Sequence, residues 1–347
     1  MKLSILIAMY NTEKYIGNCL ESLINQDIKV EDYEIIVIND GSTDNSVSVV
    51  ESYIKRNKNI VLYNQSNIGI TQTSNKLLKL AKGKYLYKID SDDYIAHNTL
   101  GTLLKIAEKS NLDALGFNSC KTTRLDLHKL DTEIISEDLK ICTGVEYWSK
   151  SNNPKSSANW YLIKNDFIIK NNITFELEDN PMSDTPFTFQ LFIAIERFVF
   201  LSNVIHRYVQ VPTSGSNNRN ANHLRKRILK RKALINKLRA ISVKLENKDK
   251  SKYIGIINSL KFWSDVNVYF LFQKFLYVNI SIGDIIKIRK ELEQIKAYPM
   301  ISFTGDQSFS KKHKLITSFL NHKYLFFVGL YPLRMLVKLK LLKLSFR

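Results

Sequence analysis

The sequence predicts an α/β fold with a mainly parallel sheet, followed by a basic, mainly helical region. In the first 120 residues, short apolar runs alternate with longer amphipathic segments, which is typical of parallel strands joined by helices. The charge also changes along the chain. Residues 219–347 hold 28 Lys and Arg against 7 Asp and Glu, whereas residues 1–120 hold 13 against 14 and residues 121–218 hold 10 against 12. This split predicts a near-neutral domain and a C-terminal region that meets a polyanion.

The individual elements follow in chain order from the apolar pattern. The run at 3–8 is too short for a secretory signal, so we expect it to be a buried strand. The further predicted strands are 33–38, 60–63, 84–89 and 113–117. The predicted helices between them are 12–24, 45–56, 72–82 and 97–109. In such sheets the ligand crevice lies at the carboxyl ends of the strands.

Several classes of site are excluded by what the sequence lacks. Its three cysteines, Cys19, Cys120 and Cys142, are widely spaced and form no CxxC pair, which excludes a disulfide scaffold and a Cys-rich zinc site and favours a reducing compartment. There is no Walker A sequence, no GxGxxG turn and no HExxH. Any phosphate chemistry must therefore use other residues.

Two acidic clusters follow predicted strands. Asp40 precedes Gly41 at the end of one strand, and Asp90, Asp92 and Asp93 end another. Asp90 and Asp92 project from one face of a strand, and neighbouring carboxylates repel each other unless a cation lies between them. We therefore expect Asp40, Asp90 and Asp92 to meet around Mn²⁺ or Mg²⁺ and a diphosphate. From spacing alone, each cluster is also compatible with a turn and a helix N-cap.

Four segments in this order, LSILIAMYN (3–11), IIVINDGSTD (35–44), NIG (67–69) and KYLYKIDSDD (84–93), resemble the family-2 glycosyltransferases of the GT-A fold, of the bacterial surface-polysaccharide type. The resemblance continues more weakly from 159 to 216. It implies a GT-A domain at 1–218, with a nucleotide-sugar-binding half at 1–120 and an acceptor half at 121–218. The remainder, 219–347, is expected to be a helical extension.

The resemblance also implies roles for individual residues. Asp40 is expected to accept a hydrogen bond from the base, and Asp92 to ligate Mn²⁺ or Mg²⁺, with His206 as a further candidate ligand. Trp160 and Asp93 are candidate acceptor contacts. A structural His206 and a core Trp160 are the alternatives. A nucleoside-diphosphate sugar, commonly a UDP-sugar, is expected to contact Ala8, Tyr10, Asn11, Asp40, Asn67, Gly69, Asp90 and Ser91.

The inverting reaction of the family needs a carboxylate base for the acceptor hydroxyl. Asp184 fits, since Phe187 follows three residues later, and Asp179 of the upstream Glu178-Asp179 pair is the rival. A carboxylate that only caps the following helix is the alternative. The implied activity is hexosyl or N-acetylhexosaminyl transfer to a lipid-linked or growing surface polysaccharide. A nucleotidyltransferase and a degenerate donor-binding membrane adaptor are the other candidates.

The C-terminal third contains two basic amphipathic segments. In 223–239, eight cations alternate with an apolar stripe, and the tail reads RMLVKLKLLKLSFR with Lys340, Lys343 and Arg347 between leucines. Neither segment has the apolar length of a membrane span, so we expect both to lie on an anionic membrane at the inner, cytoplasmic face. Packing against the catalytic domain is the alternative. No motif supports binding to nucleic acid.

Overall fold

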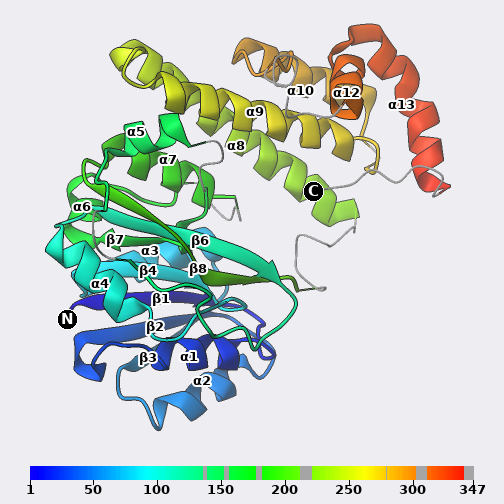
Figure 1. Cartoon of the computed structure of the whole chain (residues 1–347). Helices are drawn as coiled ribbons and strands as arrows, with labels where there is room; N and C mark the ends of the chain where they lie inside the picture. The colour runs from blue at the N-terminus through cyan, green and yellow to red at the C-terminus, as the bar shows by residue number, and fades with distance from the viewer. Residues whose placement is uncertain are drawn as a thin grey trace. The chain divides into compact units, whose positions relative to one another are not determined.

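The computed structural model describes residues 1–135, 139–151, 156–176, 182–211, 221–278, 280–301 and 311–339. The chain divides into two compact units, Met1–Ser214 and Gly215–Arg347 (Figure 1). The described part of the first unit combines a sheet with helices, and that of the second is helical. The predicted α/β class and the helical C-terminal region are therefore confirmed.

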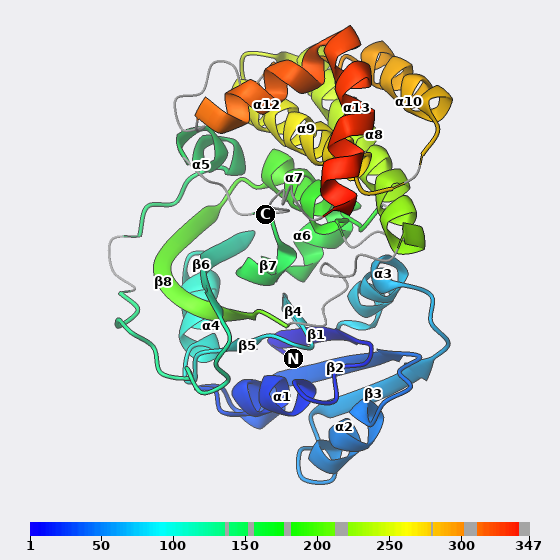
Figure 2. The ribbon, with the colours of Figure 1, turned by 90° about the vertical axis from the view of Figure 1, so that its right-hand side faces the viewer.

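Within the described residues, one eight-stranded sheet forms the centre of the first unit. Its strands are β1 (Leu3–Met9), β2 (Tyr33–Asp40), β3 (Ile60–Gln65), β4 (Tyr85–Asp90), β5 (Tyr94–Ile95), β6 (Ala114–Thr122), β7 (Tyr161–Lys164) and β8 (Phe198–Val209). They lie in the order β3-β2-β1-β4-β7-β6-β8-β5. The first four in this order are parallel, whereas β7 is antiparallel to β4 and β6, and β5 to β8. β6 and β8, which lie side by side (Figure 2), are parallel to each other. The sheet is thus mixed, and its continuous parallel part is the β3-β2-β1-β4 half that the alternation predicts.

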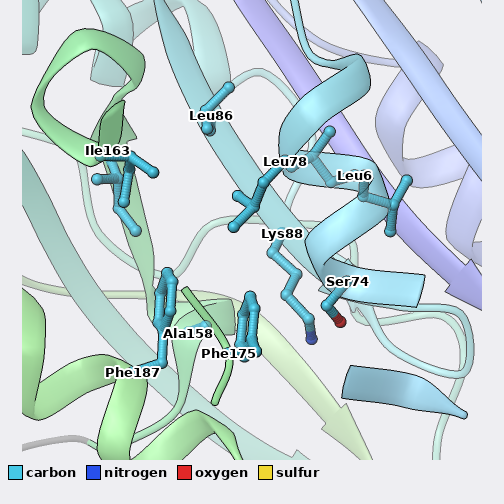
Figure 3. A pocket seen from close by; sticks show the side chains of 11 residues that line it. Leu6, Ser74, Leu78, Leu86, Lys88, Ala158, Ile163, Phe175 and Phe187 are labelled. Carbon is cyan, nitrogen blue, oxygen red and sulfur yellow. The ribbon is translucent and has the colours of Figure 1, made fainter. Parts of the chain in front are cut away.

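Alternate residues of the parallel strands face two layers of helices. Ile5, Val37 and Tyr87 belong to a core with α1 (Ile16–Ile24), α2 (Ser46–Ile54) and α4 (Leu100–Lys109). On the opposite face, a small pocket is lined by side chains from β1, β4 and β7 and from α3 (Ile70–Leu80), α6 (Asn165–Lys170) and α7 (Asp184–Ala194) (Figure 3). This second layer matters for the site because Lys88 lies in it.

The remaining described elements of the first unit are α5 (Gly144–Lys150) and the 3₁₀ turns η1 (Val30–Asp32) and η2 (Ala158–Trp160). A reciprocal pair of hydrogen bonds begins α5, in which the Thr143 hydroxyl accepts from the Glu146 amide and the Glu146 carboxylate accepts from the Thr143 amide. The turn η2 directly precedes β7, so β7 holds it beside β4, the strand that it pairs with.

Arg207 of β8 holds the irregular segment around residues 127–129 against the sheet. The side chain is almost fully buried, and its guanidinium donates to the carbonyl oxygens of Leu127 (3.0 Å), Lys129 (3.0 Å) and Val204 (2.7 Å). Leu127 and Lys129 lie outside the strands, so the Arg207 guanidinium supplies hydrogen bonds that their carbonyl groups do not obtain from strand pairing.

The second unit consists of helices around its own core. They are α8 (Ala221–Asp249), α9 (Ile254–Lys274), α10 (Ile282–Gln294), α12 (Lys311–Asn321) and α13 (Lys323–Lys338). The apolar stripe of the basic helix α8 is buried against α9: Ile228, Ile235 and Leu238 are at most 2% exposed. Arg239 of α8 also donates to the buried Asp265 of α9 (2.7 Å). None of the helices in the described ranges has both the length and the apolar character needed to cross a bilayer.

We expect Arg207→Lys to destabilise the first unit by about 2–4 kcal/mol, because a single ammonium cannot replace a buried guanidinium that donates to three carbonyl groups. Calorimetric unfolding measures the loss. Arg124→Lys is the matched control, since Arg124 is exposed and its side chain bonds only to Asp126. Equal effects of the two substitutions would show that the buried fork is not needed.

Candidate active site

The carboxyl ends of β1, β2 and β4 meet at one edge of the sheet. Ala8 of β1 lies opposite Ile38 of β2 and, on its other side, opposite Asp90 of β4. β1 therefore lies between the strands of Asp40 and Asp90, and Asp40 is two residues beyond Ile38 along β2. Asp40 thus approaches this edge from a different strand than Asp90 and Asp92, and a meeting of all three around a cation and a diphosphate stays a prediction.

Asp40 instead holds the loop that follows β3. Its carboxylate is 4% exposed and accepts hydrogen bonds from the backbone amides of Ile68 (2.9 Å) and Gly69 (3.0 Å) and from the Gln65 side chain (2.9 Å). Gly41 has a φ of +78°, and a Cβ there would lie 2.9 Å from the backbone nitrogen of Asn67. The turn after β2, which begins at Gly41, is thus in close contact with the loop after β3. At this contact Asn67 is exposed and Gly69 is buried.

Tyr10 and Asn11 form an exposed rim beside these loops. Tyr10 is 50% exposed, whereas Asn11 bonds to the turn after β2. The Asn11 amide donates to the Ser42 hydroxyl (3.0 Å), and its side-chain oxygen accepts from the Thr43 amide (2.8 Å). These bonds hold Asn11 at a φ of +50°, which asparagine tolerates better than most residues. Tyr10 is left as the free aromatic surface next to the crevice.

Asp90 belongs to a closed ring of hydrogen bonds that the sequence analysis missed. The Lys88 ammonium donates to Asp90 Oδ1 (2.9 Å) and to Asn159 Oδ1 (3.0 Å), and Asn159 Nδ2 donates to Asp90 Oδ2 (2.7 Å). Burial acts to raise the pKa of Asp90, but Lys88 and Asn159 outweigh it and lower that pKa. A lysine two residues before Asp90, in an otherwise apolar strand, was the signal available in the sequence.

Asp92 is the half-buried carboxylate of the second cluster. Its pKa is raised to about 7, first by burial and then by the nearby charges of Asp90 and Asp93. A cation would relieve this repulsion, and Mg²⁺ is often held by only one or two carboxylates together with substrate phosphates and water. Within the described ranges, no group of three or more His, Cys, Asp or Glu side chains is arranged to hold a metal ion. Asp92 therefore fits a metal that the protein holds with few ligands.

Asp93 and His206 are buried and bonded to each other. Asp93 Oδ1 accepts from the Val209 amide (2.8 Å), and its Oδ2 lies 3.1 Å from Nε2 of His206, whose Nδ1 lies 2.8 Å from the Ser119 hydroxyl. Both side chains are about 1% exposed. This placement favours a structural role at the β5–β8 edge over the acceptor contact expected of Asp93 and the metal contact considered for His206.

Ser91 is also buried, and its hydroxyl accepts from that of Thr12 (3.1 Å), the residue after Asn11. Trp160 is half-buried in η2, next to Asn159. Because Asn159 belongs to the ring of hydrogen bonds around Asp90, the position of Trp160 is compatible both with a contact to an acceptor and with a core side chain.

Asp184, at the start of α7, lies in the same site as Lys88 and Asp90. Its Oδ2 accepts from the Ser157 hydroxyl (3.1 Å), and the Ala158 amide also donates to this carboxylate. Burial raises its pKa, with Lys88 opposing and Asp90 adding to that shift. Ser157 and Asn159 thus connect the two carboxylates through η2. The rival Asp179 and its neighbour Glu178 lie outside the described residues.

A model of the family described as glycosyl transferase family 2 matches residues 4–181. Among curated proteins, the chain is similar to the uncharacterized glycosyltransferase EpsJ of Bacillus subtilis, with 29% identity over 223 residues, which are 61% of this chain and 62% of EpsJ. It is also similar to the poly(ribitol-phosphate) beta-N-acetylglucosaminyltransferase TarS of Staphylococcus aureus, with 35% identity over 116 residues, 33% of this chain and 20% of TarS. The matched region spans less than two thirds of either relative.

Two solved structures show the fold. A structure of TarS 1–349 in complex with UDP-GlcNAc has a TM-score of 0.67 and 20% identity, and the match covers 100% of this chain and 93% of that one. The mannosyltransferase PcManGT from Pyrobaculum calidifontis, in complex with GDP-Man and Mn²⁺, has a TM-score of 0.52 and 15% identity, with coverage of 97% and 88%. The GT-A architecture expected from the sequence is confirmed.

We expect Lys88→Met to lower the free energy of unfolding by about 1–2 kcal/mol, since it removes two charge-assisted hydrogen bonds. The loss is limited because the Asp90 side chain is 39% exposed and water screens the pair. The matched control is Lys84→Met just before the same strand, which removes the exposed contact with Glu108 and the approach of the ammonium to the Tyr85 ring, and is expected to cost about 0.5 kcal/mol or less. Chemical denaturation compares the two variants, and equal losses would contradict a special role for Lys88.

Proposed function

The chain belongs to glycosyl transferase family 2, and we propose that it moves a sugar from a nucleoside-diphosphate donor, preferably a UDP-sugar, to a hydroxyl group of a surface polysaccharide or its lipid-linked precursor. The observation that carries this proposal is the convergence of Asp90, Asp92 and Asp184 at one end of the sheet, with Lys88 between Asp90 and Asp184. The similarity to TarS, a protein solved with UDP-GlcNAc, supports a UDP-sugar donor.

In this proposal the donor lies across β1, β2 and β4. Tyr10 and Asn11 line the nucleotide, with Ala8 at the floor, and the loop of Asn67 and Gly69 meets the base. Asp40 acts there chiefly by holding this loop, because its carboxylate already accepts three hydrogen bonds. Asp90, held by Lys88 and Asn159, receives the ribose or the donor sugar on its remaining lone pairs. Ser91 stabilises the turn at residues 90–93 through its hydrogen bond with the Thr12 hydroxyl.

Asp184 is the proposed general base of an inverting reaction. It takes the proton of the acceptor hydroxyl while that oxygen attacks the anomeric carbon from the side opposite the leaving diphosphate. A raised pKa suits this task, since a base with a pKa nearer to neutrality is a better proton acceptor while still being ionised. The positive charge of Lys88 opposes this rise in the pKa of Asp184. Trp160 is the proposed aromatic platform for the acceptor sugar.

We assign the metal position to Asp92, with Mn²⁺ or Mg²⁺ as the ion. When bound, the ion acts as a Lewis acid that stabilises the charge of the departing nucleoside diphosphate. The Mn²⁺ in the PcManGT complex supports this assignment. The proposal does not need His206 as a ligand, because its ring is already held by Asp93 and Ser119.

The proposed organisation assigns residues 1–218 to catalysis, with the donor half at 1–120 and the acceptor half at 121–218, and residues 219–347 to a basic extension. We propose that this extension keeps the enzyme at the anionic, cytoplasmic face of the membrane, where lipid-linked acceptors are available. The surplus of 28 cations over 7 carboxylates in 219–347 supports this location. No role in nucleic-acid binding is proposed.

A panel of nucleotide sugars, tested by thermal shift and by product analysis, tests the reaction type. We expect a UDP-sugar to stabilise the protein, by about 2.7 kcal/mol at 100 times its dissociation constant, and UDP to be released on transfer. Release of pyrophosphate would indicate a nucleotidyltransferase instead. Donor binding without hydrolysis or transfer would indicate a donor-binding adaptor.

We expect Asp184→Asn to lower kcat by about 10²–10⁴-fold, because it removes the proton acceptor. The affinity for UDP, measured by calorimetry, should change by less than about threefold, a small fraction of the effect of losing a general base. Asp166→Asn is the matched control, since Asp166 is an exposed carboxylate in the first turn of α6. If Asp184→Asn keeps most activity and Asp179→Asn loses it, the base is Asp179.

We expect chelation by EDTA to stop turnover, and Mn²⁺ or Mg²⁺ to restore it. The affinity for Mn²⁺ in the presence of UDP should fall by at least about tenfold in Asp92→Asn, because that variant loses the charged ligand. Titration calorimetry and the paramagnetic signal of Mn²⁺ give this affinity without relying on activity. Full turnover in EDTA would contradict metal dependence.

A further inference from the structure

Helix α13 has apolar side chains on two opposite sides. Phe326 and Leu330 point inward and are fully buried in the core of the second unit. The other side carries five residues that are 56–74% exposed, which we call the outer stripe: Tyr324, Val328, Tyr331, Met335 and Leu339. Packing of this unit therefore accounts for only one of the two apolar sides.

The outer stripe is continuous along the helix. Its residues are spaced by four, three, four and four positions, so at 3.6 residues per turn they lie on one side of the helix from its first turn to its last residues. Leu325 and Leu336, also exposed, widen it on one flank. Monomeric soluble proteins rarely leave such a large apolar surface in water unless it meets a partner.

The orientation of the stripe is fixed by contacts on the inner side of α13. The Arg334 guanidinium donates to the carbonyl oxygens of Phe275 (2.9 Å), Val278 (3.2 Å) and Ile280 (3.0 Å). Gly329 also lies against the Phe319 ring of α12, where a Cβ would approach to 2.7 Å. The helix cannot rotate to bury its outer side without breaking these contacts.

The basic composition of the segment that contains the stripe favours one kind of partner. Residues 311–347 contain seven lysines and two arginines and no Asp or Glu. Lys323 lies at the start of the stripe, with its ammonium 5.6 Å from the centre of the Tyr324 ring. A second copy of this chain on the same face would bring like charges together, which is unfavourable. A surface that combines anionic groups with an apolar interior matches both properties.

We propose that the outer stripe of α13 inserts into the interfacial region of an anionic lipid bilayer, while the surrounding cations meet the headgroups. Exposed aromatic and aliphatic side chains on one side of a helix, with lysines beside them, are typical of interfacial helices. The proposal deepens the proposed membrane location and replaces the expectation for α8, whose apolar stripe is buried against α9. Of the tail residues expected to contribute, Lys340, Lys343 and Arg347 lie outside the described residues.

Co-sedimentation of the full chain with vesicles tests this docking face. The vesicles contain phosphatidylcholine alone or with phosphatidylglycerol. We expect binding to the mixed vesicles to be at least about tenfold stronger, since each cation near an anionic surface adds about 1 kcal/mol. The variant Val328→Ser with Tyr331→Ser should lose about tenfold or more of that binding, because two exposed apolar groups no longer leave water.

The matched control is Leu229→Ser with Val243→Ser, which removes two exposed apolar side chains from the basic helix α8. We expect its lipid binding to stay within about twofold of the unchanged protein, because neither residue belongs to the stripe. Equal losses in both variants, or no preference for phosphatidylglycerol, would overturn the proposal. A shift in oligomeric state without a change in lipid binding, seen by light scattering of the Val328/Tyr331 variant, would also overturn it and would assign the face to a second copy.

The affinity for UDP distinguishes a failure of the docking face from a failure of the proposed function. UDP affinity, measured by calorimetry, is expected to be unchanged in both double variants, because the altered residues lie outside the donor site. If UDP does not bind to any form while the vesicle results hold, the proposed function fails and the docking face remains. If UDP binds and the vesicle results fail, only the docking face is overturned.

Discussion

The Lys88 ammonium is the charge on which the arrangement of the site depends. It bonds to Asp90 and Asn159 and lies close enough to Asp184 to influence that carboxylate. Two carboxylates near each other are stable as anions only if a cation compensates them, and here that cation belongs to the chain. Through Asn159, the same contacts connect β4 to the turn η2, and so to the part of the first unit that carries Asp184. Donor residues and the candidate base are thereby held in one network.

The sequence predicted the parallel half of the sheet well, because each of its strands is an apolar run followed by a helix with its own stripe. β7 and β5 were missed, since a strand of four residues and one of two give no clear alternation. Asp90 and Asp92 at the end of β4 and Asp184 at the start of α7 were each predicted to be site residues, and the structure places Asp90 close enough to both Asp92 and Asp184 to influence their pKa values. Spacing did not reveal that β1 lies between the strands of Asp40 and Asp90, because pairing order is a tertiary property.

Buried polar partners were harder to predict than exposed motif residues. Asp93 and His206 are far apart in the chain and pair only because β5 lies beside β8. Likewise, α8 and α13 both carry an apolar stripe in a basic segment, yet the stripe of α8 is in a core and the outer stripe of α13 is exposed. An amphipathic sequence pattern shows that a helix has an apolar face, but only the packing of the folded chain decides whether that face is buried.

The contact between Asp40 and the loop after β3 has a consequence for engineering. Since one carboxylate fixes the backbone of Ile68 and Gly69, this loop is held in place without a ligand, so the proposed donor would cause little loss of ordering entropy on binding there. Replacing Asp40 in order to alter base preference would release that loop as well. Redesign of the nucleobase preference is therefore better directed at the exposed side chains of Tyr10 and Asn67, which the scaffold does not need.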